Sequence, residues 1–407
     1  MTNLTSFERR VIERPDQAAM LAQVLAWSAV NSGSRNLDGL AKMAALLADA
    51  FAVLPGEISL IQPAKVTAIG SDGVETVLAH GQHLLVTVRP ESARRLLFTG
   101  HMDTVFGIDH AFQTTRWLDD NILNGPGVAD MKGGIAVMLA ALQAIEAGAR
   151  PLAFGLDFGY DIIINSDEEV GSLSSAALIA AHAAGKIAAL TYEPSALPDG
   201  TLAGARPGSG NFSITIRGQA AHAGRNPEDG RNALVAAADL AVRLKTAARP
   251  GLAINPAKID GGSANNVVPD MAVLRVNVRP LTHEDEQAAK LLLYDVTNAI
   301  AVDHDVHVHV HGGFARPPKP IDVAHRRLFT LVEQAGADLG LRITHADTGG
   351  VCDGNNIAAC GVPVVDTMGV RGGNIHSADE YMFIDSLAER ARLSALSILR
   401  ILDRGIL

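Results

Sequence analysis

Cysteine, aromatic residues and basic charge are all scarce in this sequence. It holds only 2 cysteines among 407 residues, and aromatic residues make up 4% of the chain. Two cysteines are too few for a disulfide framework or a structural zinc site. Lysine and arginine number 34 against 44 aspartates and glutamates, which gives a formal net charge of −10 and no basic stripe. This balance argues against a nucleic-acid partner.

Long apolar runs are also missing. The first residues, MTNLTSFERRVIERPDQ, are polar and charged, and they contain no apolar segment of the kind found in a secretory signal. No later run approaches the ~18 consecutive apolar residues that suggest a membrane span. We therefore expect no membrane partner and a cytoplasmic location.

What the sequence does have is length and many small apolar residues. Hydrophobic residues make up 48% of the chain and glycine contributes 39 residues, a balance typical of closely packed α/β enzymes. A chain of 407 residues exceeds the size at which a single hydrophobic core usually stops growing. Two domains are therefore expected.

The two ends of the chain predict an α/β domain. Residues 18–52 contain two helical patterns, and residues 129–148 contain another. Short apolar runs between such patterns are predicted to be buried strands, among them RLLFTG, YDIIINS and PVVDTM. Strands that alternate with helices indicate a mainly parallel sheet flanked by helices. We assign residues 1–206 and 320–407 to this domain.

The middle of the chain has a different pattern. From about residue 207, the period-two stretches GSGNFSITIRG, MAVLRVNVRP and HDVHVHVHGG are separated by two helical stretches. Period-two alternation indicates half-exposed antiparallel strands. The order suggests an inserted α+β domain of ferredoxin-like type over residues 207–319.

Acids and histidines stand at or near the predicted strand ends of the outer domain. They are His101, Asp103, Asp130, Glu168, Glu169, Glu193 and His376. In open α/β sheets, ligands bind beyond the carboxyl ends of the strands. Carboxylate and imidazole donors without thiolate suit two zinc or similar divalent ions that share a carboxylate and drive a hydrolytic step. Of the adjacent Glu168 and Glu169, one would be a ligand and the other a base.

Several short motifs occur in a fixed order over nearly the whole chain. They are GHMDTV, GPGVADMKGG, SDEEVGS, YEP, GQAAHAG, NNVVP and HSADEY. Together they resemble the dizinc metallopeptidase family of aminoacylases and glutamate carboxypeptidases, and are most similar to its carboxypeptidase G branch. The resemblance implies a zinc-exopeptidase-like catalytic domain with two divalent metal ions per subunit. Zn²⁺ is the first expectation, and Co²⁺ or Mn²⁺ are alternatives.

The resemblance also implies the ligand set. Asp130 would bridge the two ions. His101 and Glu193 would complete one ion site, and Glu169 and His376 would complete the other.

Two further residues acquire roles in the same way. Glu168 would be the general base, which takes a proton from water and later gives it to the leaving amine. Asp103 would hydrogen-bond the His101 imidazole and fix its tautomer.

The inserted domain is implied to be a lid that forms a homodimer. His222 resembles the lid histidine that stabilises the developing oxyanion from the partner subunit. Asn266 and either Arg279 or Arg316 resemble groups that bind a substrate carboxylate. Gly350, in the stretch DTGGVCDGN, would shape the substrate pocket by letting backbone approach the substrate. Cys352 stands where many relatives have a smaller residue.

Two other patterns have simpler explanations. His307, His309 and His311 share one face of a predicted strand, but no acid accompanies them, so a solvated face is favoured over a metal site. The stretch GPGVADMKGG is not a G-x-G-x-x-G fingerprint, and no Walker lysine pattern occurs, which argues against a nucleotide site.

The function implied is a metal-dependent amide hydrolase. We expect a metallo-carboxypeptidase that releases a C-terminal amino acid, glutamate or a similar acid, from a small peptide or N-acyl conjugate. An N-acyl-amino-acid deacylase or dipeptidase is the alternative within the same chemistry. A metal-bound but catalytically silent binding module is the alternative from another class, and the complete set of ligand and base positions argues against it.

Overall fold

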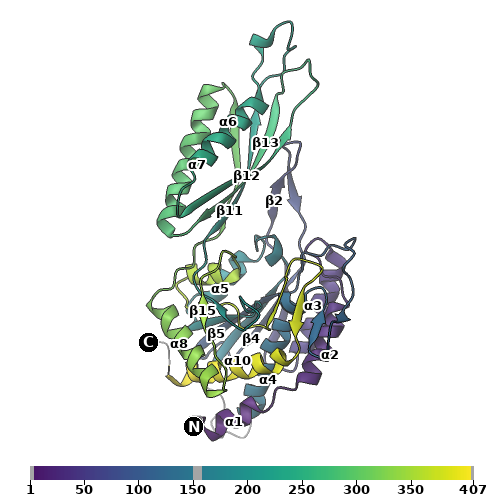
Figure 1. Cartoon of the computed structure of the whole chain (residues 1–407), viewed down its shortest axis with the longest axis vertical. Coiled ribbons are helices and arrows are strands. Elements are labelled where there is room, and N and C mark those ends of the chain that lie inside the picture. The colour runs from purple at the N-terminus through teal and green to yellow at the C-terminus, as the bar shows by residue number, and fades with distance from the viewer. Residues whose placement is uncertain (1–3, 150–157, 405–407) are drawn as a thin grey trace. The chain divides into compact units, whose positions relative to one another are not determined.

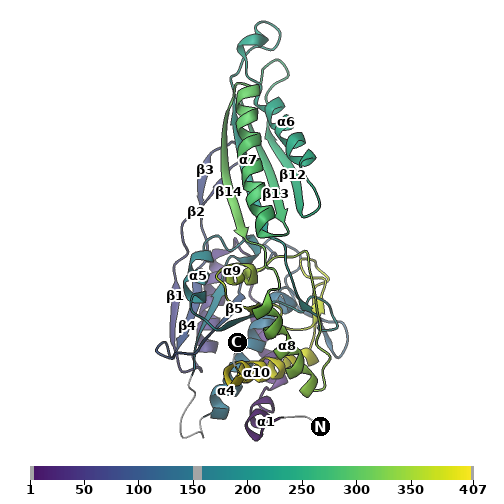
Figure 2. The same cartoon turned by 90° about the vertical axis from the view of Figure 1, so that its left-hand side faces the viewer.

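The chain divides into two compact units. The computed structural model describes residues 4–149 and 158–404. The first unit comprises Met1–Ala64, Ala79–Ala205 and Ile321–Leu407, and the second comprises Lys65–Leu78 and Arg206–Pro320. Figure 1 and Figure 2 show both units in colours that follow the chain.

A mixed six-stranded sheet forms the centre of the first unit. Its strand order is β1-β4-β8-β5-β9-β16. The strand bounds are β1 Glu57–Ile61, β4 His83–Val88, β5 Arg95–His101, β8 Gly159–Asn165, β9 Ala188–Thr191 and β16 Val364–Val365. The last four strands of the order run parallel to one another, whereas β1 and β4 pair antiparallel. The carboxyl ends of β8, β5 and β9 therefore meet at one edge of the sheet.

Helices cover this sheet and supply most of the main core. They are α1 Ser6–Ile12, α2 Gln17–Ser28, α3 Leu37–Phe51, α4 Gly134–Ala149, α5 Ala176–Ala183, α8 Val323–Asp338, α9 Asp353–Ala359 and α10 Asp385–Arg404. Helices α4 and α10 lie side by side (Figure 1). The segment Val128–Gly148 is long and apolar enough to cross a membrane, but 94% of its most apolar window is buried inside the protein. This burial marks it as a core helix.

Two small sheets connect distant parts of the first unit. One has the order β17-β18-β7-β6 and the other pairs β10 with β15. The bounds are β6 Arg116–Trp117, β7 Ile122–Asn124, β10 Leu202–Ala203, β15 His345–Ala346, β17 Gly372–Gly373 and β18 Tyr381–Phe383. The antiparallel β7–β18 pairing sets Asn124 opposite Tyr381. This register brings the chain around residue 127 next to the chain around residue 380.

The second unit contains a ferredoxin-like fold, as predicted. Its elements are β11 Ser209–Arg217, α6 Ala233–Thr246, β12 Leu252–Gly261, β13 Met271–Pro280, α7 His283–Asp303 and β14 His307–Arg316. The sheet order is β12-β13-β11-β14 and each pairing is antiparallel. On β13, Val276 and Val278 are buried, whereas Asn277 and Arg279 on the other face are half-buried. Helices α6 and α7 cover the apolar face (Figure 2).

A short hairpin of the second unit comes from the N-terminal part of the chain. It consists of β2 Val66–Ile69 and β3 Glu75–Leu78. The Thr67 hydroxyl lies 3.1 Å from His311 Nε2, and Arg217 donates a hydrogen bond to the Gly73 carbonyl at 3.1 Å. Sequence alone had placed this stretch in the outer domain. Its strand pattern is local and does not reveal which sheet the hairpin packs against.

Candidate metal centre

Three neighbouring parallel strands deliver four residues of the predicted site. His101 is the last residue of β5, and Glu193 follows β9 by two positions. Glu168 and Glu169 form a single helical turn, Glu168–Val170, just after β8. Because β8, β5 and β9 are adjacent and parallel, their ends converge where ligands bind in such sheets.

Two further residues arrive from loops. Asp130 lies in the irregular segment Val128–Gly133 ahead of α4, and its peptide bond to Met131 is cis. His376 lies in the loop between β17 and β18, with a φ of 64°. A left-handed conformation is uncommon for a residue other than glycine, and such residues concentrate at functional sites.

The two carboxylate oxygens of Asp130 face two different histidines. Oδ1 is 3.0 Å from His101 Nε2, and Oδ2 is 3.3 Å from His376 Nε2. Glu193 Oε2 lies 3.6 Å from His101 Nε2, and Glu169 Oε2 lies 3.1 Å from His376 Nε2. Asp130 therefore stands between two donor groups, each made of one histidine and one glutamate.

These spacings fit divalent metal ions. Donor atoms that bind one ion at about 2.0–2.2 Å are at most about 4.4 Å apart. The histidine–carboxylate distances within both donor groups, at 3.0–3.6 Å, lie inside this limit. Oxygen and imidazole nitrogen donors are the ligands of zinc and similar ions in hydrolytic sites.

The electrostatics of the cluster favour an added positive charge. Burial and the nearby Asp130 charge raise the pKa of Glu169 to about 7. Hydrogen bonds to Asp130 and Glu169 raise the pKa of His376 to about 11. Burial alone would lower the pKa of His101, but Glu193, Asp103 and Asp130 raise it well above its usual range. Crowded carboxylates therefore hold protons on the histidines, and a dication would replace these protons.

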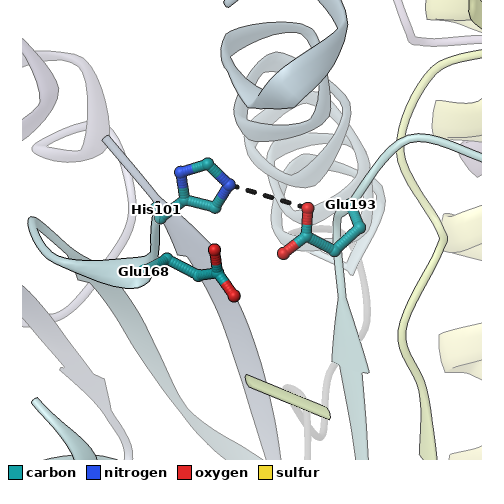
Figure 3. A group of neighbouring side chains, drawn as sticks. All are labelled: His101, Glu168 and Glu193. Carbon is teal, nitrogen blue, oxygen red and sulfur yellow. Dashed lines mark ion pairs between the residues drawn. The ribbon is translucent and has the colours of Figure 1, made fainter. Parts of the chain in front are cut away.

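Glu168 faces the His101–Glu193 pair. Figure 3 shows the Glu168 carboxylate directed toward the space beside the His101 ring and the Glu193 carboxylate. One ligand atom from each of these three residues lies within 4.8 Å of the others. Glu168 is half-buried, whereas His101 and Glu193 are buried. A carboxylate at this position can exchange protons with water or substrate held by the cluster.

Asp103 supports both His101 and the glutamate turn. Its main-chain carbonyl lies 3.0 Å from His101 Nδ1, and its carboxylate Oδ1 lies 3.4 Å from the same nitrogen. A carbonyl only accepts, so Nδ1 donates a proton to it, and Nε2 is the nitrogen whose proton a metal would replace. The carboxylate also accepts the N–H groups of Glu168 and Glu169, both at 3.2 Å. The Ser34 hydroxyl donates to it at 2.7 Å.

Sequence reasoning missed Glu380. It belongs to the motif HSADEY but received no role. In the structure it is buried, and its carboxylate accepts the N–H groups of Gly127, Ala129 and Asp130. The only sequence signal was an acid four residues after His376.

The four predicted lid residues fall in two places within the second unit. Exposed His222 lies beside the Asn266 segment, where the Ala223 N–H donates to the Asn266 carbonyl at 2.9 Å. His222 follows Arg217 and Asn266 precedes Met271, so both lie at the end of the sheet where Arg217 pairs with Met271. Half-buried Arg279 and buried Arg316 lie at the opposite end, near Ser209.

The stretch around Gly350 is an exposed loop ahead of α9 in the first unit. The Gly350 N–H donates to the Thr348 hydroxyl at 3.4 Å. Cys352 is buried and caps α9, accepting the Gly354 N–H at 3.4 Å. Asp353 accepts hydrogen bonds from Asn165 and Ser172, both at 2.6 Å, which ties this loop to the segment that carries Glu168 and Glu169.

Comparison with protein families identifies the chain. The model of peptidase family M20/M25/M40 matches residues 97–400, which is well over half of the chain. The chain belongs to this family. Carboxypeptidase G2 of Pseudomonas sp. (strain RS-16) is 31% identical over 332 residues, covering 79% of this chain and 77% of that protein. The predicted family is therefore confirmed.

Other relatives of this M20 chain carry different names. The succinyl-diaminopimelate desuccinylase of Psychrobacter arcticus is 27% identical over 322 residues, covering 73% of this chain and 76% of that protein. The solved structure of a tripeptidase from Staphylococcus aureus has a TM-score of 0.72 at 24% identity, covering 96% of this chain and all of that one. Membership of the M20 family makes the chain a metal-dependent hydrolase of amide bonds.

Proposed function

We propose that this M20 chain is a metallo-carboxypeptidase that uses two divalent ions, with zinc as the first expectation for both. It would release a C-terminal glutamate or similar acid from a small peptide or N-acyl conjugate. The observation that carries the dimetal proposal is the placement of the Asp130 oxygens, one against His101 and the other against His376. A single carboxylate between two donor groups is the arrangement that a bridged ion pair requires.

The ligand roles follow from this arrangement. His101 and Glu193 would hold one ion, His376 and Glu169 the other, and Asp130 both. Bound ions of this kind polarise the amide carbonyl and make water more acidic. Asp103 keeps His101 in the tautomer that leaves Nε2 free, because its carbonyl accepts the proton on Nδ1.

Glu168 would move the proton. Its carboxylate faces the His101–Glu193 pair (Figure 3). From there it would take a proton from the attacking water and then give it to the leaving nitrogen. The hydrogen bond from its own N–H to Asp103 holds the turn in place during both steps. General acid–base catalysis of this kind contributes about 10²–10⁴-fold to the rate.

A matched pair of substitutions separates the two glutamates. Glu168→Gln should lower kcat by about 10²–10⁴-fold with two ions still bound. Glu169→Gln should instead lose one ion per subunit, because it removes a charged ligand. Metal analysis and steady-state kinetics on both variants distinguish the roles. A Glu168→Gln protein with wild-type kcat would contradict the proposed base, and a wild-type protein that binds ions but hydrolyses no amide would support the binding-module alternative.

The substrate class is tested by a panel. Similarity to carboxypeptidase G2 supports a carboxypeptidase, and similarity to the desuccinylase supports the alternative of an N-acyl-amino-acid deacylase. The metal-loaded protein should be offered aryl-acyl-glutamates, dipeptides, and N-acetyl and N-succinyl amino acids. We expect the highest kcat/KM for C-terminal glutamate. Faster turnover of N-succinyl or N-acetyl substrates regardless of the amino acid would favour the deacylase.

We also propose a homodimer formed through the second unit. Helix α6 exposes Val235 and Val242, 53% and 64% accessible, on one stripe. Strand β12 beside it is a sheet edge that pairs with β13 alone among the described strands. An exposed apolar stripe next to an open sheet edge is suited to pairing with a second copy.

The placement of the lid residues supports a shared site. Strand β11, nine residues long, spans about 27 Å and separates the His222 and Asn266 end from the Arg279 and Arg316 end. A small substrate cannot reach both ends of one lid. If His222 stabilises the oxyanion, and Asn266 and one of the arginines bind the substrate carboxylate, the two ends must come from different subunits.

Mixed dimers test this directly. Glu168→Gln and His222→Ala proteins should each be nearly inactive. After subunit exchange, about half of the dimers are hybrids, and one site in each hybrid has both residues intact if His222 acts across the dimer. Activity should then recover to about a quarter of the wild-type value. No recovery, with exchange demonstrated by labelled subunits, would refute the role of His222 in the partner's site.

A further inference from the structure

Glu380 joins the two loops that complete the cluster. Its side chain is 1% exposed. Carboxylate Oε1 accepts the N–H groups of Ala129 and Asp130 at 3.0 and 3.1 Å, and Oε2 accepts the N–H group of Gly127 at 3.2 Å. One side chain thus ties down three residues of the loop that ends at Asp130.

The main chain of the same region is bound to that loop as well. Asn124 Nδ2 donates to the Glu380 carbonyl at 2.7 Å and to the Ala378 carbonyl at 3.1 Å. The Gly125 N–H donates to the Glu380 carbonyl at 3.2 Å. The β7–β18 pairing continues these contacts. The segment that carries His376 and the loop that carries Asp130 therefore form one hydrogen-bonded assembly.

The chemistry of this position calls for a carboxylate. The side chain meets three backbone donors, and a carboxylate offers acceptors on both oxygens. A glutamine would still accept on one oxygen, but its NH₂ group would face a backbone N–H. The buried ammonium of Lys132, bonded to the Val30 carbonyl at 3.0 Å, lies two residues beyond Asp130 and is electrostatically coupled to Glu380. Burial and the charge of Asp130 raise the pKa of Glu380 to about 8, whereas the hydrogen bonds from the three backbone N–H groups lower it. Cations held at Asp130 would offset the Asp130 charge and favour the ionised carboxylate.

We propose that Glu380 is a positioning residue that fixes the Asp130 carboxylate between the two ion sites. It acts through the backbone of residues 127–130 and does not bind an ion itself. This role rests on the dimetal site proposed above. Partners behind metal ligands typically change metal affinity by about 10–100-fold when they are replaced.

Metal titration of the Glu380→Gln protein tests the proposal. The metal-free full chain is titrated with Co²⁺, followed by its visible absorption, and with Zn²⁺ in competition with a chromophoric chelator. We expect both ions to bind about 10–100-fold more weakly than in the wild type, with an altered Co²⁺ spectrum. The Glu8→Gln variant is the control, because Glu8 is also a buried carboxylate that accepts a backbone N–H, on α1. It should bind both ions normally.

The outcomes separate the two proposals. If the wild type binds two ions and Glu380→Gln binds them with unchanged affinity and spectrum, the positioning role is wrong and the dimetal site stands. If the wild type binds fewer than one ion, both fail. Should Glu380→Gln not fold by circular dichroism, Glu380→Asp keeps the charge but withdraws the oxygens by one methylene. It should bind ions about tenfold more weakly, and wild-type binding would overturn the inference.

Discussion

Replacing Asp103 with asparagine should slow catalysis while leaving both metal ions bound. The carboxylate accepts the N–H groups of Glu168 and Glu169, one on each oxygen, and the Ser34 hydroxyl on the second. An asparagine has one acceptor oxygen, so in either orientation its NH₂ group faces one of the two backbone N–H groups. The turn that carries the proposed base then loses a support, and a buried donor is left unsatisfied.

The size of the effect follows from these contacts. Losing one hydrogen bond to a charged group costs about 1.5–3 kcal/mol, and about 1.4 kcal/mol corresponds to a tenfold change in rate. If the loss appears in the transition state, kcat falls by about 10–150-fold. The His101 tautomer should be unaffected, because its Nδ1 proton is accepted by the Asp103 main-chain carbonyl at 3.0 Å.

Steady-state kinetics together with metal analysis decide whether the Asp103 carboxylate acts through the proposed base or through the proposed metal ligands. We expect a reduced kcat and two ions per subunit. A variant that loses metal in proportion to activity would show that the carboxylate acts through the proposed ligands His101 or Glu169 rather than through the proposed base Glu168. A wild-type kcat would refute both of these roles of the Asp103 carboxylate. Ser34→Ala serves as a control, because it removes only the hydroxyl donor and leaves both N–H bonds to Asp103 in place.

The other predictions concern stability and assembly. Burial raises the pKa of Asp161, but bonds from His182 and Lys186 and the charge of Arg95 outweigh it and lower the pKa to about 2. Because this pKa lies below the unfolded value of about 3.9, the ionised carboxylate stabilises the folded state by about 2–3 kcal/mol above pH 4, and this stability is lost as the pH falls from 4 toward 2. Asp161→Asn should therefore lower the free energy of unfolding at pH 7, and urea titrations followed by tryptophan fluorescence should show the difference shrinking below pH 4; a difference independent of pH would contradict this. Chelation of the metal should lower Tm by several degrees and zinc should restore it, since an ion present at 1,000 times its Kd adds about 4 kcal/mol; an unchanged Tm would argue against the site. Val242→Glu on α6 should give monomers in analytical ultracentrifugation, whereas Val302→Glu on α7, at an even more exposed residue, should leave the dimer intact; dimers in both variants would place the interface elsewhere.

Local sequence patterns predicted most elements of the fold. The alternation of MAVLRVNVRP coincides with β13 (Met271–Pro280), because one face of that strand is buried and the other is not. Strand β12 was missed because Pro256 interrupts its pattern, next to an irregularity in its pairing with β13. The β2–β3 hairpin was assigned to the outer domain with the rest of residues 1–206, since the strands it packs against lie far away in the sequence.

The candidate site was predicted less completely. Strand-end positions such as His101 and Glu193 are visible in sequence because parallel strands place their ends together. Supporting contacts are not visible in the same way. The bonds of Glu380 join residues about 250 positions apart, and no local period encodes them. The opposite placement of His222 and Arg316 within one lid follows from strand direction, which emerges only when the sheet order is known.

The division of the chain between the units has a consequence for biosynthesis. The first unit is completed only by its last segment, Ile321–Leu407. The second unit is already complete at Pro320, and Ala79–Ala205 of the first unit separates its two segments. On a ribosome, the ferredoxin-like fold is fully synthesised before His376 and Glu380 emerge. Because domains can fold during synthesis, the lid has the opportunity to form while the metal cluster still lacks one of its histidines. If His376 holds the second ion of the proposed site, a nascent chain stalled before residue 376 would carry a folded lid and bind one ion fewer, so the second ion would bind only after the C-terminal part has been synthesised.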